Sequence, residues 1–420
     1  MRARRLLLAA ACLVAAYAAG GPDPAPPAVS PPSPAASAAA YFTPQEIARG
    51  RAYSRGRSAL ALAGMAVRLG VLALLVFTPL SAALRDAALA VGRRGWVAAV
   101  LYAAAALALL MAARFPLALS GGFLRERAWG LSTQPFAGWF ADYAKGAALL
   151  AVLAVPMAVG LWALMRAAPH GWPWIAGAAT VCLAVSLAFV APVIIDPLFH
   201  AFRPVADPAL DRDVRALGAR AGITVDKVLV ADASRRTTKA NAYFTGLGRT
   251  KRIVLYDTLL KAAPPDEVRM VVAHEMGHWR HQHIWKGLAL SAAAGFLGWG
   301  IAGAVLSWAA ARPAFRLTGP GDIAGLALVA LVLVALDAAT LPVQNAISRA
   351  FERQADQASL ELTGDRAAFI RGEVTLARSN LSDVAPPRPI VWLLYTHPPV
   401  LERIAAAEAF AASLEPGRRP

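Results

Sequence analysis

The stretch Val271-Val272-Ala273-His274-Glu275-Met276-Gly277-His278-Trp279 decides how the rest of the chain is interpreted. It carries the pattern H-E-x-x-H, and two further histidines follow at positions 281 and 283. Positions i and i+4 of a helix lie one turn apart on the same face, so His274 and His278 can direct two imidazoles at one metal ion. Glu275 lies beside them, where its carboxylate can take a proton from an attacking water molecule. The spacing predicts a metal site with a general base on one helix.

The residues before the motif favour this interpretation. With 7 histidines among 420 residues, a given histidine has about a 1 in 60 chance of another one four places on, and the intervening glutamate makes an accidental match rarer. Pro264-Pro265-Asp266-Glu267 can open a helix, since proline suits the first turn and acidic side chains suit its positive end. The alternative, a solvated helix that merely carries histidines, is the less favoured hypothesis.

The composition is that of an integral membrane protein. Hydrophobic residues make up 58 % of the chain and charged residues only 16 %, where soluble domains have about 25 %. The formal net charge of +16 first suggests nucleic acid, but the arginines are scattered between apolar runs rather than clustered with aromatic residues. We therefore expect a lipid bilayer as partner, and no nucleic acid. Cys12 and Cys182 lie in apolar runs and indicate neither a metal site nor a disulfide framework.

Six apolar runs are long enough, or nearly so, to cross about 30 Å of hydrocarbon as helices. They comprise residues 59–84, 96–113, 146–165, 174–195, 287–310 and 323–341. Tryptophans lie at or near several of their ends, as interfacial aromatic residues do. Arg68 and Asp337 fall inside such runs, and an intramembrane charge usually faces an internal cavity or a partner. For Asp337, snorkelling from the nearby end of the run is an equal alternative.

The N-terminus leaves the number of spans open at six or seven. Met1-Arg2-Ala3-Arg4-Arg5, followed by the apolar residues 6–19, fits a cleaved signal peptide and an uncleaved first membrane helix equally well. Residues 21–39 are rich in Pro, Ala and Ser and predict a flexible linker, and residues 43–57 predict a short helix with a basic end.

Polar segments separate the apolar runs. A polar, aromatic loop is expected at residues 121–145, and a soluble segment at about 199–285. The elements that the pattern predicts in the soluble segment are a helix at 208–221, a strand at 227–231, an extended piece at 240–244 and a strand at 252–256. The turn Gly246-Leu247-Gly248-Arg249 makes the last two a hairpin.

The C-terminal part offers a third metal ligand. After the last apolar run we expect helices at 345–362 and 365–378, a proline-rich turn at 386–389 and a helix after His397-Pro398-Pro399. A catalytic zinc site normally has three protein ligands and one open position. Glu352, in Ser348-Arg349-Ala350-Phe351-Glu352-Arg353-Gln354-Ala355-Asp356, is the best-placed donor. Asp356 follows one turn later and could accept the second N–H of a ligating histidine.

The chain resembles the Ste24-type CAAX prenyl endopeptidases, the integral-membrane branch of the M48 zinc metallopeptidases. The matching stretches are the loop 121–145, Asn241-Ala242-Tyr243-Phe244 with the segment 252–260, the motif at 274–278, the segment 348–356, and Tyr395-Thr396-His397-Pro398-Pro399 with Arg403. The likeness runs from about residue 41 over nearly the whole chain. It implies a mainly α, multi-pass membrane protein of six to seven spans enclosing a chamber, with a small α+β zincin-like metallopeptidase region. Members of this type have seven membrane helices, and the N-terminal run would be the seventh.

The resemblance also implies roles for single residues. One Zn²⁺ per chain would be held by His274, His278 and Glu352, with Glu275 as general base. Asn241 and Ala242 would lie on an edge strand to which an extended substrate adds through its backbone. The further implied roles are these: Asn241 and His397 would help to hold the substrate or the oxyanion, Asp356 would support a ligand, and Arg403 would serve structure or substrate positioning.

These features divide the chain into six segments. The segments are 1–20, a signal peptide or first membrane helix; 21–57, a linker and short helix; 58–198, membrane helices; 199–285, a catalytic segment with the motif helix; 286–345, a membrane helix hairpin; and 346–420, a C-terminal catalytic segment with the third zinc ligand.

Three functional hypotheses follow. The first is a membrane-embedded zinc endopeptidase that cuts peptide or protein substrates near their C-terminus, with isoprenylated substrates as one option. The second keeps the zinc chemistry but clears misfolded membrane proteins, as HtpX-type peptidases do, with no prenyl requirement. The third is a transporter or binding protein with structural zinc.

The basic N-terminus favours a cytoplasmic start, which with one true span before residue 49 would place the catalytic face outside. The basic residues at 49–57 and in the catalytic segments favour the cytoplasm for that face, as does the family resemblance. We expect a multi-pass protein of the cell membrane with its catalytic face in the cytoplasm.

Overall fold

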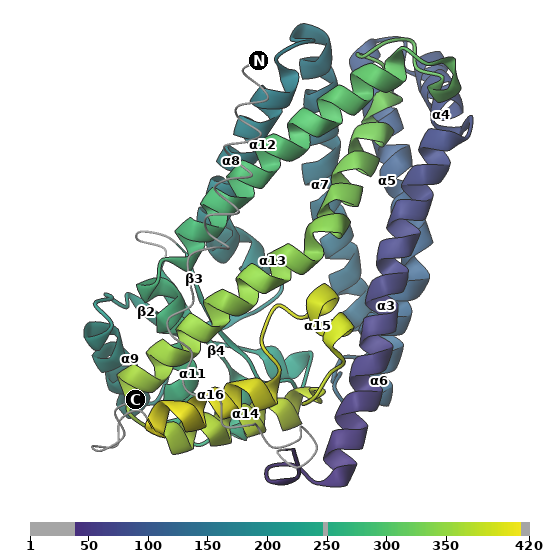
Figure 1. Cartoon of the computed structure of the whole chain (residues 1–420). Coiled ribbons are helices and arrows are strands. Elements are labelled where there is room, and N and C mark those ends of the chain that lie inside the picture. Colours follow the sequence, from purple (N-terminus) through teal and green to yellow (C-terminus); the bar gives the residue numbers. More distant parts are fainter. Residues whose placement is uncertain (1–37, 247–250, 413–420) are drawn as a thin grey trace.

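The computed structural model describes residues 38–246 and 251–412. The N-terminal basic and apolar segment, most of the predicted linker and most of the predicted hairpin turn lie outside these residues. The predicted seventh span lies outside them as well. Within the described residues, long apolar helices are joined to a smaller α+β region at one end (Figure 1).

Six of the described helices are long and apolar enough to cross a membrane. They are α3 (Pro44–Phe77), α5 (Gly95–Leu119), α7 (Phe136–Ala167), α8 (Trp172–Val190), α12 (His283–Ala310) and α13 (Gly325–Thr363). Each of the six predicted apolar runs falls wholly or largely in one of these helices. The prediction of a mainly α, multi-pass membrane protein is therefore confirmed.

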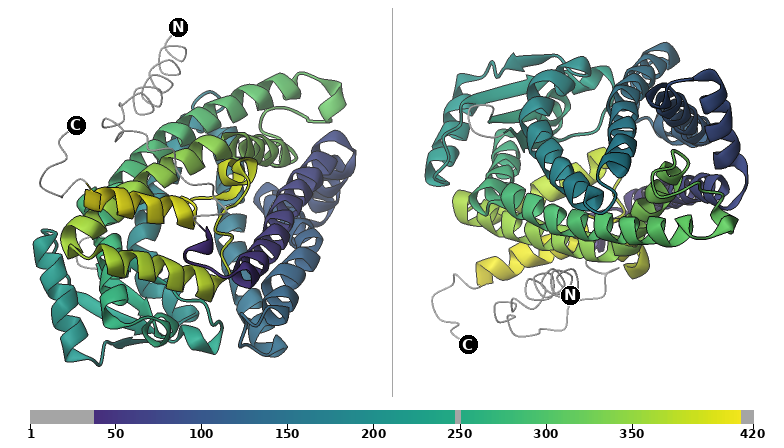
Figure 2. Two further views of the ribbon diagram at one scale, coloured as in Figure 1. Left: turned by 60° about the horizontal axis from the view of Figure 1, so that its bottom comes forward. Right: turned by 90° about the horizontal axis from the view of Figure 1, so that it is seen from above.

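The six helices form a closed ring (Figures 1 and 2). Along the ring α3 contacts α5, α5 contacts α7, α7 contacts α8, α8 contacts α12, α12 contacts α13, and α13 returns to α3. Only 6–22 % of the residues in the most apolar windows of these helices are buried within the protein.

The apolar core of the ring lies at the end far from the α+β region. The ends of α3, α7 and α12 meet the beginnings of α5, α8 and α13 there. Leu75, Tyr102, Met165 and Leu306 are almost fully buried in this core. The hydroxyl groups of Ser81 and Tyr102 lie 2.6 Å apart within it, so this polar pair is satisfied internally. Close apolar packing of the helix ends therefore closes the ring at this end.

Two predicted helix boundaries are wrong. The predicted short helix at 43–57 and the first apolar run form one helix, α3, which ends before Pro79; α4 (Leu80–Val91) follows. The last apolar run and the predicted helix at 345–362 are also one helix, α13, which passes through Pro342. The end of an apolar run marks the edge of the hydrocarbon and not the end of backbone hydrogen bonding, so a helix can continue into polar sequence.

The predicted loop at 121–145 is largely helical. α5 continues through a π-helical turn at Ser120–Leu124 into α6 (Arg125–Ala128), and α7 begins at Phe136. Aromatic rings pack across this turn, with centroids 5.7 Å apart for Phe123 and Trp139 and 5.3 Å apart for Phe115 and Tyr143. These contacts explain why the segment is rich in aromatic residues: they hold the ends of two membrane helices together.

The two charges in the apolar runs have different surroundings. Arg68 is half-buried, and its Nε is buried without a hydrogen-bond partner among the described residues. Asp337 is exposed, and its Oδ1 accepts a hydrogen bond from Gln344 Nε2 at 3.3 Å. Asp337 is thus joined to a residue two turns nearer the polar end of α13.

A four-stranded sheet forms the centre of the α+β region. Its strands are β1 (Phe202–Pro204), β2 (Lys227–Ala231), β3 (Ala242–Thr245) and β4 (Arg252–Tyr256), in the order β1-β2-β4-β3. β2 and β4 are parallel and have the predicted limits, whereas the other two pairs are antiparallel. β1 was not predicted, and β3 begins two residues later, and ends one residue later, than the extended piece predicted at 240–244. β3 is an edge strand, so one side of its backbone is open to another chain.

Helices cover this sheet and carry the motif. Three helices pack with the strands around a core that includes Val214, Ile253 and Met276. They are α9 (Pro208–Arg220), α10 (Asp257–Ala262) and α11 (Pro265–Arg280). The chain after α13 adds α14 (Arg366–Asn380), α15 (Arg388–Leu394) and α16 (Val400–Ala412). α15 begins within the predicted proline-rich turn. α11 packs on both α13 and α14, which places the motif between the sheet and the C-terminal helices (Figure 1).

Candidate metal centre and active site

The motif helix α11 packs closely against α13. α11 begins with Pro265, and Asp266 and Glu267 follow at its positive end, as predicted. Gly277 lies where the two helices approach: a Cβ there would be 2.9 Å from the Cα and from the carbonyl oxygen of Ala355. Such a contact is too close for any side chain. The glycine within the motif therefore lets the α13 turn around Ala355 lie against it.

This approach brings His274, His278 and Glu352 together. One ligand atom from each lies within 4.8 Å of the others. The Nε2 atoms of the two histidines are 3.1 Å apart, and oxygens of Glu352 lie 3.3 Å from Nε2 of His274 and 3.5 Å from Nε2 of His278. Two imidazoles and one carboxylate are a donor set typical of a catalytic zinc site with an open fourth position.

The donor atoms fit a cation because the protein alone does not satisfy them. The buried Oε2 of Glu352 accepts no hydrogen bond from the described residues. His274 and His278 direct their Nε2 atoms at each other. A buried carboxylate oxygen without a partner is costly, and a cation held by the three groups would remove that cost. Burial and the neighbouring His274 lower the pKa of His278 to about 3.

A group of buried charges lies behind His274. Its Nδ1 is 2.8 Å from Oδ1 of Asp356, which is one turn beyond Glu352 on α13. Arg403 of α16 donates from Nε to Asp356 at 2.8 Å and from Nη1 to Glu373 of α14 at 2.6 Å. Burial by itself lowers the pKa of His274, but hydrogen bonds with Asp356 and Glu352 outweigh it and raise the pKa to about 10. Arg403 is thus engaged by two carboxylates and is not a free cation.

Glu275 contacts the edge strand. Its Oε2 accepts a hydrogen bond from the backbone N–H of Phe244 in β3, at 3.1 Å. Tyr243 and Thr245 pair with β4 on the other side of the strand, so the N–H of Phe244 belongs to the open edge. Burial raises the pKa of Glu275, because a carboxylate loses hydration there. The predicted base therefore lies between the metal ligands and the open edge of β3.

The other predicted site residues surround the same centre. Asn241 is exposed directly before β3, and its carbonyl accepts a hydrogen bond from Tyr256 N–H at 3.0 Å; Ala242 is buried as the first residue of β3. His397 approaches from the C-terminal segment, with Nε2 3.3 Å from Oε2 of Glu352, and its side chain is 59 % exposed. Its Nδ1 lies 2.9 Å from the hydroxyl of Thr396. His397 thus borders the cluster from its accessible side.

Sequence reasoning missed the polar contacts that position the edge strand. Arg236 Nε lies 2.8 Å from Asp142 of α7, and Lys239 Nζ lies 2.6 Å from Glu126 of α6. Lys239 also donates to the Tyr53 hydroxyl of α3 at 2.9 Å. The segment leading into β3 is therefore attached to two helices of the membrane ring, α3 and α7, and to α6, which continues α5. The charges within the 121–145 segment were a signal for such contacts, but their partners are about a hundred residues away.

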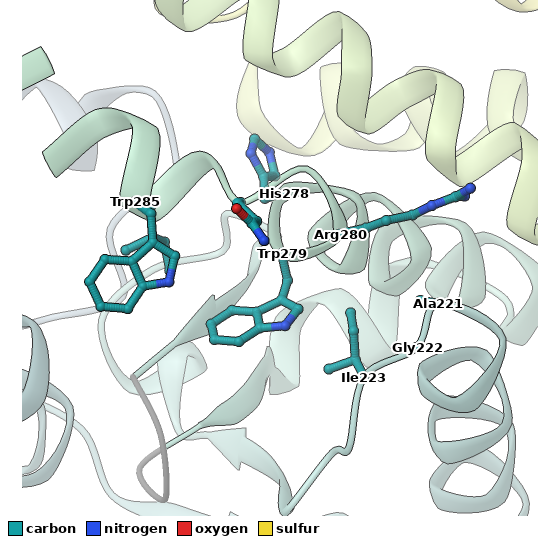
Figure 3. Close-up of a pocket in the computed structure, with 9 residues that line it drawn as sticks. Ala221, Gly222, Ile223, His278, Trp279, Arg280 and Trp285 are labelled. Carbon is teal, nitrogen blue, oxygen red and sulfur yellow. The ribbon is translucent and has the colours of Figure 1, made fainter. Parts of the chain in front are cut away.

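A cavity of about 230 Å³ lies beside the motif (Figure 3). It is lined by His278 as well as by Ile223, Trp279, Trp285 and neighbouring residues. In Figure 3 the imidazole of His278 points toward α13, while Trp279 points the opposite way. The cavity thus adjoins the metal cluster at His278.

Comparison with known proteins agrees with this architecture. The model of peptidase family M48 matches residues 204–411, and the model of the CAAX prenyl protease N-terminal region with five membrane helices matches residues 28–201. The crystal structure of Ste24p from S. mikatae superposes with a TM-score of 0.76 at 25 % identity, covering 87 % of this chain and 89 % of that one. The chain belongs to peptidase family M48. Membership makes it a metallopeptidase, and the likeness to Ste24p places it in the membrane-embedded, Ste24-type branch.

Individual relatives support the same assignment. The uncharacterized metalloprotease YhfN of Bacillus subtilis is 34 % identical over 288 residues, which are 67 % of this chain and 66 % of the relative. CAAX prenyl protease 1 of Saccharomyces cerevisiae is 29 % identical over 309 residues, 70 % of this chain and 68 % of the relative. The chain thus spans about two thirds of the length of these M48 relatives.

Proposed function

We propose that this M48 peptidase is a zinc endopeptidase whose ligands are His274, His278 and Glu352. The observation that carries the proposal is the convergence of two imidazoles and a buried carboxylate beside Glu275 and an open strand edge. A closed structural zinc site would have four protein ligands, usually with cysteine, and Cys182, the cysteine within the described residues, does not belong to this group. The M48 assignment likewise argues against the transporter hypothesis.

The residues divide the work of peptide hydrolysis among them. Zn²⁺, when bound, supplies a Lewis acid that polarises the scissile carbonyl and stabilises the oxyanion. Glu275 takes the proton of the attacking water and returns it to the leaving amine. Without substrate, Phe244 N–H donates a hydrogen bond to Oε2 of Glu275. His397 donates a hydrogen bond to the developing oxyanion, since its exposed ring borders Glu352.

The substrate lies along β3 as an added strand. The open edge of β3 offers backbone groups at Ala242 and Phe244, and Asn241 precedes them as a side chain that can bind the substrate. Arg403 and Asp356 hold His274 from behind and act by positioning it. The relatives named CAAX prenyl proteases motivate a substrate that is isoprenylated and cut near its C-terminus.

The deciding experiment is mass-spectrometric analysis of a farnesylated C-a-a-X peptide incubated with the purified wild type and with Glu275→Ala. Cleavage after the modified cysteine by the wild type alone is the expected result. An unmodified peptide of the same sequence is the matched substrate control. If both peptides are cut equally, the prenyl group is not required and a quality-control peptidase of the HtpX kind is favoured. If the wild type cuts neither these peptides nor a denatured membrane protein, the proposal is wrong.

The proposal places the catalytic face in the cytoplasm of a multi-pass cell-membrane protein. α3 begins at this end of the ring. Its first turns carry four exposed arginines, namely Arg49, Arg51, Arg55 and Arg57. Basic residues next to membrane helices are retained on the cytoplasmic side. A reporter enzyme that is active only outside the cytoplasm, fused to the C-terminus, should be inactive. An active fusion would reverse the orientation.

A further inference from the structure

The two histidines of the motif have different partners behind them. Nδ1 of His274 faces a carboxylate, Asp356, at 2.8 Å. Nδ1 of His278 instead faces Nδ1 of His283, the first residue of α12, at 3.0 Å. Nε2 of His283 then lies 2.8 Å from Oε1 of Gln354 on α13. An uncharged chain of two hydrogen bonds therefore stands behind one ligand, whereas a carboxylate paired with Arg403 stands behind the other.

His283 is held firmly in this place. It is 6 % exposed, and its ring is stacked on Phe351 with centroids 4.3 Å apart and planes inclined by 6°. The imidazole of His281 also stacks on that of His283, with centroids 5.7 Å apart and planes inclined by 16°. Phe351 and Gln354 flank Glu352 on the same part of α13. One stretch of α13 thus supplies a metal ligand, a platform for His283 and an acceptor for its outer nitrogen.

Only one arrangement of protons satisfies this chain while leaving His278 able to bind a metal. A lone pair on Nε2 of His278 requires the proton to be on Nδ1, which then donates to Nδ1 of His283. His283 must accept there, so its own proton is on Nε2. That N–H donates to the side-chain oxygen of Gln354, which can only accept. Read from the other end, the amide oxygen of Gln354 fixes the proton of His283 on Nε2, and this in turn fixes the proton of His278 on Nδ1.

We infer that His283 and Gln354 are positioning residues that fix the tautomer and the orientation of His278, so that His278 offers Nε2 to the metal. The inference rests on the proposed zinc site and adds residues to it. Partners behind metal-binding histidines are commonly worth 10–100-fold in metal affinity. The chain also connects the metal centre with the start of α12, the membrane helix that follows the motif.

Two substitutions of His283 separate this role from simple packing. His283→Phe keeps an aromatic ring on Phe351 but offers no acceptor to His278. His283→Asn loses the ring, while its Oδ1 stands near the place of Nδ1 and can accept the same hydrogen bond. Zinc affinity of the full-length protein in detergent, measured by competition with a chelator, should fall 10–100-fold in His283→Phe and less than about fivefold in His283→Asn. A packing role predicts the reverse order.

Further variants and a second readout complete the test. His170→Asn, an exposed histidine between α7 and α8 and far from the site, should bind zinc as the wild type does. Gln354→Met should weaken binding in the same direction as His283→Phe. The visible absorption of the Co²⁺-loaded protein should change in His283→Phe, because the coordination geometry alters, and remain as in the wild type in His170→Asn. Equal zinc affinity of His283→Phe and the wild type would overturn the inference; absence of zinc binding by the wild type would instead refute the zinc site itself.

Discussion

The carboxylate of Glu275 accepts a hydrogen bond from the backbone N–H of Phe244, at 3.1 Å, across the gap between α11 and the edge strand β3. This bond joins the proposed general base to the strand on which the proposed substrate lies. An added substrate strand would compete for the same N–H. Binding of substrate and release of one oxygen of Glu275 are therefore coupled events in the proposed mechanism.

Glu275→Gln should abolish hydrolysis and leave zinc binding intact. The amide preserves the size of the side chain and can still accept from Phe244 N–H, but it cannot take a proton from water. We expect kcat to fall by at least about 10²–10⁴-fold, the usual contribution of a positioned general base. Peptide turnover and zinc content of the same purified sample measure the two effects.

The matched control for this substitution is Glu402→Gln. Glu402 is exposed in the first turn of α16, outside the metal cluster, and its change should leave kcat and zinc content as in the wild type. Turnover by Glu275→Gln within tenfold of the wild type would show that another group is the base.

Asp142→Asn should weaken the attachment of the edge strand to the membrane ring. Its ion pair with Arg236 is largely buried, with side chains 18 % and 14 % exposed, and the substitution leaves the guanidinium without its counter-charge. Loss of one partner of a buried pair is costly, in the range of a few kcal/mol. We expect a lower thermal midpoint and a raised KM for peptide, because the segment before β3 is no longer fixed.

Asp211→Asn provides the comparison for Asp142. Asp211 pairs with Arg215 on the surface of α9, with side chains 32 % and 49 % exposed, and such a pair contributes about 0–1 kcal/mol. This variant should melt close to the wild type. Equal thermal midpoints for Asp142→Asn and Asp211→Asn would show that the contact does not support the strand.

Local sequence patterns predicted much of the fold. Alternating and β-branched residues define β2 and β4 to the residue, and Asp207-Pro208 begins α9 because the aspartate caps it and proline suits its first turn. The membrane spans follow from apolar length alone. The helix ends do not, because α3 and α13 continue beyond the hydrocarbon for as long as their backbones can hydrogen-bond.

The site was less predictable because most of its contacts join distant parts of the chain. The H-E-x-x-H spacing is local, so it identifies His274, Glu275 and His278 without a fold. Glu373, by contrast, appears in the sequence as one acid among 26 Asp and Glu, and only the crossing of α14 and α16 places it at Arg403. His283 is likewise visible as a histidine after the motif, but its partner on α13 is not.

Glu373 should make folding stability depend on pH. Burial raises the pKa of Glu373 to about 7 in spite of the adjacent Arg403, whereas an unfolded glutamate titrates near 4.3. The folded state therefore binds more protons between these values, and this contribution to stability falls as the pH rises from about 4.3 to 7. Glu373→Gln should remove this part of the slope. Unfolding of both proteins followed across this range, at constant zinc, gives the difference; parallel curves would contradict the assignment.

His397→Gln should lower kcat more than it changes KM or zinc binding. The side chain is 59 % exposed, so the fold should be retained. Its Nε2 lies 3.3 Å from a ligand oxygen of Glu352, close enough to reach an oxyanion at the same centre. Loss of one such donor costs about 10²–10³-fold in kcat. His170→Gln, an exposed histidine in the loop at the opposite end of the ring, is the control and should have wild-type turnover. If zinc content fell with kcat in His397→Gln, the histidine would be a fourth ligand, and the donor role would be wrong.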